Sequence, residues 1–125
     1  MVSFSKNFKL GNKYIGENFP TYFIADIASN HDQNLERAKK LILLAKKAGA
    51  DAVKFQHFTA ESLVSDIEFA KLKLKSHQSK WNDSTFNIYK KNELLFEWTY
   101  ELYKCAKKNN IDFFTAAYSP ELVDK

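Results

Sequence analysis

The sequence of 125 residues is poor in the residue types that mark several classes of protein. It contains three glycines, two prolines and a single cysteine, Cys105. One cysteine excludes an internal disulfide and fits a reducing compartment. No apolar run reaches the length of a bilayer-spanning helix, and residues 1–16 lack the apolar segment of a secretory signal. We therefore expect a soluble cytoplasmic protein without a membrane partner.

Motifs that bind nucleotides or activate a nucleophile are also missing. The sequence has no glycine-rich phosphate loop, no dinucleotide fingerprint and no nucleophile elbow. The net charge of +4 comes from lysines scattered over helix faces, and no basic groove with interleaved aromatics suggests a nucleic-acid partner. No spacing of His, Asp and Glu predicts a metal site. The mild positive charge is compatible with an anionic substrate.

One stretch near the N-terminus organises the chain. Residues 21–28 (TYFIADIA) and 51–56 (DAVKFQ) are apolar, β-rich runs that predict two strands. Between them, residues 35–48 place apolar side chains three or four positions apart, which predicts an amphipathic helix. Asn34 is the expected N-cap and Gly49 the expected C-terminal stop. Two strands joined by a helix form a parallel βαβ unit, and ligands bind at the carboxyl ends of such strands.

The remaining sequence continues this alternation. Residues 57–92 are too long for an ordinary connection and predict a functional excursion with short helices, one of them capped by Asp83. A second helix is expected at about 97–109 and a third strand at 111–119. Pro120 then opens another helix.

The fold class expected from this pattern is α/β, with a parallel sheet. A closed (β/α)8 TIM barrel needs eight strands and typically about 250 residues. Residues 1–125 would supply roughly the first three βα units of such a barrel. Within this range, about residues 1–20 would form a lead-in to the first unit that includes a short hairpin. The chain is therefore expected to be the N-terminal portion of a barrel domain.

Asp26 and Lys54 are the strongest candidates for catalytic or substrate-binding residues. Each lies near the end of a strand whose inward face is otherwise apolar or small, so neighbouring strands would bring them within a few ångströms. One interpretation is an anion-binding ammonium beside a carboxylate that orients or deprotonates water. The other is a buried ion pair that sets strand register without chemistry. The spacing favours neither.

Several weaker candidates surround this pair. Gln56 follows Lys54 on the same face and can hydrogen-bond a ligand, although spacing alone favours an amide satisfied by the backbone. Asn30 and His31 lie in the first βα loop, where substrate contacts concentrate. A lone histidine in a polar loop is more often a turn residue than a metal ligand. Trp98 and Cys105 are both expected to lie on the apolar side of the second helix, in the protein core.

The segment FIADIASNHDQNLERAKKLILLAKKAGADAVKFQHFTAESLVS resembles the N-terminal stretch of the sialic acid synthase family. That family includes N-acetylneuraminate synthases and related legionaminate, pseudaminate and spore-coat sugar synthases. The similarity rests on IADIASNH at residues 24–31, AGADAVKFQ at 48–56 and IDFFTAAYSPELVD at 111–124. Residues 76–90 are similar to the excursion of one subgroup. The resemblance covers nearly the whole chain from about residue 20.

The resemblance implies a TIM barrel that condenses phosphoenolpyruvate with an N-acyl hexosamine such as N-acetylmannosamine, giving a nonulosonic acid and phosphate. Lys54 would bind phosphoenolpyruvate, Gln56 would contact the sugar, and Asp26 would assist the attack of water. Asn30, His31 and Thr115 are further expected substrate contacts. A divalent metal, Mn²⁺ or Mg²⁺, would be bound by histidines outside this chain. The family also implies a homodimer.

Two departures from the family are visible. Asp26 stands where most members have glutamate, although one subgroup also uses aspartate. Ala116 lacks the hydroxyl of the usual strand-three motif.

The alternative hypothesis is a non-catalytic remnant that binds at most a small acidic or phosphorylated ligand. A different barrel aldolase that shares only the βαβ front end is less compatible with AGADAVKFQ. The isolated chain is expected to show no synthase activity.

Overall fold

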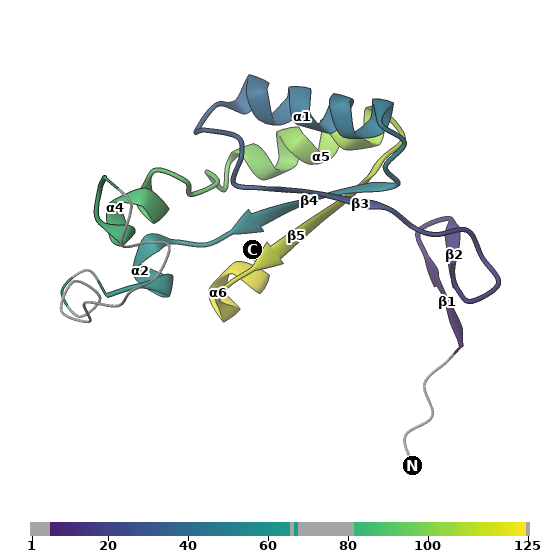
Figure 1. The fold of residues 1–125 in the computed structure, drawn as a ribbon, viewed down its shortest axis with the longest axis horizontal. Coiled ribbons are helices and arrows are strands. Elements are labelled where there is room, and N and C mark those ends of the chain that lie inside the picture. The colour runs from purple at the N-terminus through teal and green to yellow at the C-terminus, as the bar shows by residue number, and fades with distance from the viewer. Residues whose placement is uncertain (1–5, 66, 68–81, 125) are drawn as a thin grey trace, which may run out of the picture.

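The computed structural model describes residues 6–65, 67 and 82–124, and Figure 1 shows a small hairpin followed by a sheet covered by helices on one face. Residues 76–81, the first part of the segment 76–90 that is similar to one subgroup, lie outside the described residues. The described helices and strands are, in chain order, β1 Asn7–Leu10, β2 Lys13–Gly16, β3 Ile24–Ala28, α1 Leu35–Lys47, β4 Ala52–His57, α2 Ala60–Leu63, α4 Thr85–Lys90, α5 Trp98–Lys108, β5 Asp112–Ala117 and α6 Pro120–Val123.

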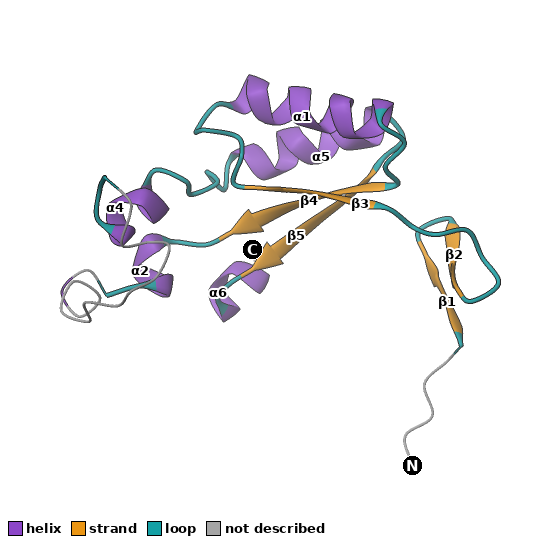
Figure 2. Cartoon of the chain, viewed as in Figure 1, coloured by secondary structure: helices purple, strands orange, loops and turns teal. Residues whose placement is uncertain are grey.

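The main sheet has the order β3-β4-β5, and both pairs of neighbours are parallel. Helices α1 and α5 lie side by side over the same face of this sheet (Figure 2). The α/β class, the parallel βαβ unit and the short helices of the excursion are therefore confirmed. No helix in the described part of the chain is long and apolar enough to cross a bilayer.

The core fills the space between the sheet and the two helices. Ala38 and Ile42 of α1 and Leu102 of α5 are fully buried against Val53 and Phe55 of β4. The Phe55 ring also stacks on Phe113 of β5, with the ring centroids 5.6 Å apart. Because side chains alternate along a strand, burial of positions 53 and 55 turns positions 54 and 56 to the opposite face. The core thus sets which side chains can form a site.

The boundaries of α1 follow the sequence signals. The side chain of Asn34 accepts a hydrogen bond from the backbone N–H of Arg37 at 2.9 Å, which satisfies one free donor of the first turn. Gly49, with φ +90°, ends the helix in the left-handed region. Asn110, with φ +51°, does the same after α5. The stop at Gly49 was predicted from the sequence.

The predicted cap of α4 was wrong by one residue. Ser84 is the N-cap, and its hydroxyl accepts a hydrogen bond from the N–H of Asn87 at 3.1 Å. Asp83 precedes the helix and accepts hydrogen bonds from the Ser84 N–H at 2.8 Å and from the Asn87 side chain at 2.9 Å. Ser84 has the extended backbone of an N-cap residue. Asp83 is therefore the residue before the cap, and its carboxylate supports the helix start only through these hydrogen bonds.

The expected hairpin is confirmed as antiparallel β1 and β2, and it is tied to the amino end of the sheet. Lys13 forms an ion pair with Asp51, whose second oxygen accepts a hydrogen bond from the N–H of Phe23 at 2.7 Å. The Tyr22 hydroxyl donates to Asp112 at 2.5 Å. Residues 22 and 23 therefore connect the segment before β3 to Asp112 and Asp51. The strand β3 itself begins at Ile24, later than the predicted start of the first strand.

Candidate active site

Asp26 and Lys54 form an ion pair on the face of the sheet that the helices leave open. The two residues are register partners across β3 and β4, and Lys54 Nζ lies 3.0 Å from Asp26 Oδ2. The predicted proximity is therefore confirmed. The side chains are 52% exposed for Asp26 and 36% exposed for Lys54, so in this chain the pair is accessible to a ligand rather than buried.

A bulge in β3 follows Asp26 directly. The register with β4 shifts between Asp26 and Ala28, which places one extra residue, Ile27, in β3. Ile27 is buried in the core while Ala28 adopts φ +51°, a conformation that residues with a Cβ rarely take. As a result Ala28, and not Ile27, is the register partner of Phe55, while Asp26 remains opposite Lys54. Bulges of this kind are common beside active sites because they re-aim one side chain.

Gln56 lies two positions beyond Lys54 on the same face of β4. Its register partner on β5 is Ala116, and the partner of Lys54 is Phe114. The open face therefore presents a carboxylate, an ammonium and an amide beside an aromatic and a methyl side chain. Ala116 is the position of the missing hydroxyl, and the structure places it on this face.

Thr115 lies on the opposite face, with Phe113. Its hydroxyl is 2.5 Å from Nδ1 of His57, and Nε2 of the same ring is 2.8 Å from the hydroxyl of Thr99 in α5. The structure therefore does not bring Thr115 to Lys54, because the alternation that places Ala116 on the open face turns the preceding side chain toward the helices.

The first βα loop uses its two candidates to hold its own shape. The Asn30 amide donates to the Ile27 carbonyl at 3.0 Å, and the Asn30 carbonyl accepts from Arg37 Nε at 2.8 Å. His31 is fully buried, packs edge-on against Trp98, and accepts at Nδ1 from the Gln33 N–H at 3.2 Å. Burial lowers the pKa of His31. A ligand on the open face does not reach this imidazole in the present arrangement.

The NeuB family matches residues 41–125, about two thirds of the sequence. The chain belongs to the NeuB family. It is 32% identical to the N,N'-diacetyllegionaminic acid synthase of Legionella pneumophila over 91% of this chain and 32% of that protein. It is 33% identical to the N-acetylneuraminate-9-phosphate synthase of Homo sapiens over 88% of this chain and 30% of that protein. The named relatives are thus sugar-acid synthases, and the chain spans about a third of their length.

A solved structure agrees with this assignment. The N-acetylneuraminic acid synthetase from Leptospira borgpetersenii superposes with a TM-score of 0.78 at 28% sequence identity, over 96% of this chain and 37% of that one. The resemblance to the sialic acid synthase family is therefore confirmed, for the N-terminal part of its members.

One residue of the NeuB-family chain had no role in the sequence interpretation. His57, the last residue of β4, is 4% exposed, and burial lowers its pKa. The signal that could have found it is strand alternation: His57 continues the helix-facing series of Val53 and Phe55. A histidine in such a series is expected to be buried and to need hydrogen-bond partners.

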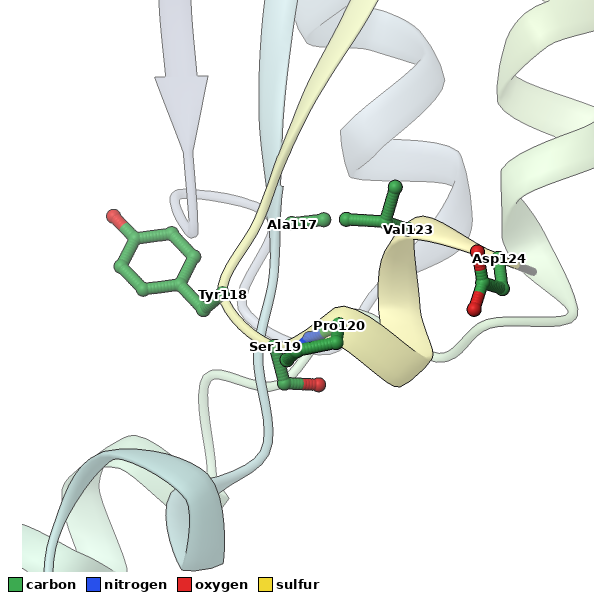
Figure 3. Close-up of a pocket in the computed structure, with 6 residues that line it drawn as sticks. All are labelled: Ala117, Tyr118, Ser119, Pro120, Val123 and Asp124. Atoms are coloured by element: carbon green, nitrogen blue, oxygen red, sulfur yellow. The ribbon is translucent and has the colours of Figure 1, made fainter.

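A shallow pocket of about 510 Å³ lies at the carboxyl end of β5. Figure 3 shows its wall, in which the backbone turns sharply at Ser119 and Pro120 and returns as α6 beside Ala117. The N–H of Tyr118 donates to the carbonyl of His57 at 3.0 Å, so the end of β4 supports this turn. Within the described ranges, no group of three or more His, Cys, Asp or Glu is placed to bind a metal ion.

Proposed function

We propose that the chain is the front part of a sialic-acid-type synthase, which condenses phosphoenolpyruvate with an N-acyl hexosamine. The observation that supports this most directly is the accessible Asp26–Lys54 pair, at 3.0 Å, on the open sheet face of a NeuB-family chain. The enol carbon of phosphoenolpyruvate would attack the sugar aldehyde. Water would then add to the resulting cation, and phosphate would leave with cleavage of its C–O bond.

The residues on the open face suit separate roles in that reaction. Lys54 would pair with an anionic group of phosphoenolpyruvate, since an ammonium and a phosphate or carboxylate form a strong charge-assisted hydrogen bond. Asp26, held beside it, would orient and deprotonate the attacking water. Gln56 would hydrogen-bond a sugar hydroxyl or carbonyl. Thr115 and His31 receive no substrate role here, because the Thr115 hydroxyl is hydrogen-bonded to His57 on the other face of the sheet and His31 is fully buried.

The complete protein would have further features that follow from the same proposal. The three strands would be the first part of a (β/α)8 barrel, in a cytoplasmic homodimer. A Mn²⁺ or Mg²⁺ ion would polarise the sugar aldehyde, but the described residues do not form a ligand set for it. We therefore assign no step to this chain through the metal.

Lys54→Ala in the complete protein tests the proposed role of the ammonium. Loss of a charge-assisted hydrogen bond costs about 1.5–3 kcal/mol, so affinity for phosphoenolpyruvate should fall roughly 10- to 100-fold while affinity for the sugar changes little. Isothermal titration with each substrate measures both. Lys40→Ala, on the exposed side of α1, is the matched control and should leave both affinities unchanged. Equal losses for the two substrates in Lys54→Ala would favour a purely structural ion pair.

A second candidate is a non-catalytic chain that binds a small acidic or phosphorylated ligand. The exposure of the Asp26–Lys54 pair is the observation in its favour, because an accessible ammonium binds anions without any further residue. Binding of phosphoenolpyruvate by the complete protein without formation of a sugar acid would support this candidate over the synthase.

A further inference from the structure

The end of β4 has a buried histidine whose two ring nitrogens are both hydrogen-bonded. Nδ1 of His57 pairs with the Thr115 hydroxyl of β5 at 2.5 Å, and Nε2 pairs with the Thr99 hydroxyl of α5 at 2.8 Å. The ring also packs edge-on against Phe96, with centroids 5.8 Å apart. One imidazole thus joins two neighbouring strands and the first turn of the helix that covers them.

The backbone of the same residue adds a third connection. The His57 carbonyl accepts the Tyr118 N–H at 3.0 Å, and His57 is the register partner of Ala117. These contacts lie at the carboxyl edge of the sheet, where the open face presents Lys54 and Gln56. Successive side chains of a strand project to opposite faces of one backbone, so a rotation at His57 would also displace Gln56.

We propose that His57 is a positioning residue for phosphoenolpyruvate binding: through Thr99 and Thr115 it holds the ends of β4 and β5 against α5, and thereby orients Lys54 and Gln56. This inference rests on the proposed function. His57 lies on the helix-facing side and does not touch the substrate itself. Its effect is on the geometry of the neighbouring face.

The hydrogen-bond chemistry of the triplet makes the role specific to an imidazole. A neutral imidazole offers one donor and one acceptor, and each threonine hydroxyl can take either role. Phenylalanine fills similar space but leaves both hydroxyls without the ring partner. Glutamine retains a donor and an acceptor on one flexible chain, so it can restore part of the connection.

The test compares His57→Phe and His57→Gln with wild type in the complete protein. Affinity for phosphoenolpyruvate is measured by isothermal titration at a temperature where circular dichroism shows every variant folded. We expect about a tenfold loss for His57→Phe and a smaller loss for His57→Gln, as a shift of roughly 1.4 kcal/mol corresponds to tenfold. Ile42→Val is the matched control. It also weakens the core, but its apolar side chain takes no part in the hydrogen bonds of His57, so it should lower the melting temperature without changing this affinity.

Each outcome decides the matter. An unchanged affinity in His57→Phe, or an equal loss in Ile42→Val, overturns the positioning role while leaving the proposed function intact. Absence of phosphoenolpyruvate binding in wild type overturns the proposed function, and this inference with it. If His57→Phe does not fold, Thr115→Val removes the shorter of the two ring contacts in an isosteric way. Thr115→Val should then lower the affinity for phosphoenolpyruvate as expected for His57→Phe, and Ile42→Val remains the control.

Discussion

A single strand, β4, supplies residues to two surfaces with different physical demands. Lys54 and Gln56 face away from the helices, where a charge can remain hydrated until a ligand replaces the water. Val53, Phe55 and His57 face the helices, where each polar atom needs a partner inside the protein. The two-residue period of the strand therefore separates an open polar face from a packed face at the scale of one residue.

Asp26→Asn is expected to separate activity from stability. An ion pair that is exposed to this degree contributes at most about 1 kcal/mol, so the free energy of unfolding should change little. Loss of the proposed general base should lower turnover by roughly 10²- to 10⁴-fold. Phosphate release and urea unfolding of the complete protein measure the two quantities, with Glu36→Gln on α1 as the control carboxylate. Turnover close to wild type in Asp26→Asn would show that this carboxylate is not the base.

The two buried histidines predict that stability falls in mild acid. Burial lowers the pKa of His31 and of His57 below the ordinary value of 6.5, with Asp32 opposing the shift at His31 and the neighbouring imidazole of His31 adding to it at His57. The unfolded state then binds protons first, so stability is complete above about pH 6.5 and is lost as the pH falls from there toward the folded-state pKa values.

Melting temperatures between pH 5 and pH 7.5 measure this effect. We expect a rise with pH across the window, and a shallower rise in His31→Phe and His57→Phe, each of which removes one titrating group. A profile that keeps its full slope in both variants would assign the pH dependence to other groups.

At the scale of whole elements, local signals and strand pairing contributed differently. The cap at Asn34, the stop at Gly49 and the hydrophobic face of α1 were all predicted, because each depends on residues within one turn of one another. The bulge in β3 was not predicted. A bulge is a property of two strands in register, and the sequence of one strand does not specify it.

Ala28→Gly should stabilise the protein at this bulge. Alanine at φ +51° is strained, and glycine adopts this region freely, so a gain of about 0.5–1 kcal/mol is expected despite the greater entropy of the unfolded chain. Ala25→Gly in the same strand is the matched control, and it should lower stability because its backbone has no positive φ to relieve. Denaturant midpoints measure both. Destabilisation by Ala28→Gly of the same size as by Ala25→Gly would show that the bulge stores no strain.

At the scale of the whole molecule, the parallel sheet has three strands in the described ranges, and β3 and β5 each pair on one side only. The Asp26–Lys54 pair is correspondingly half open to solvent. Preorganised charges act most strongly where water is excluded, so these strands alone provide a binding face rather than an enclosed reaction site.

A polypeptide limited to residues 1–125 is therefore expected to show no synthase turnover. Incubation with phosphoenolpyruvate, N-acetylmannosamine and Mn²⁺, followed by mass spectrometry for the sugar acid, is the direct measurement. The complete protein is assayed in parallel at equal concentration, and the proposed function expects the product there. Detectable product from the short polypeptide would show that these strands, with whatever they assemble into, suffice for the reaction.

The sequence by itself determined the α/β class, the βαβ unit, the ends of α1 and the pairing of Asp26 with Lys54. These depend on hydrophobic period, on capping chemistry and on the rule that parallel strands end at one edge, all of which are local or repetitive. Only the tertiary structure decided that Thr115 joins His57 rather than Lys54 and that His31 is buried on Trp98. The first outcome depends on which face β5 turns toward α5, and the second on how the loop before α1 packs against α5, so both are set by packing of the whole layer.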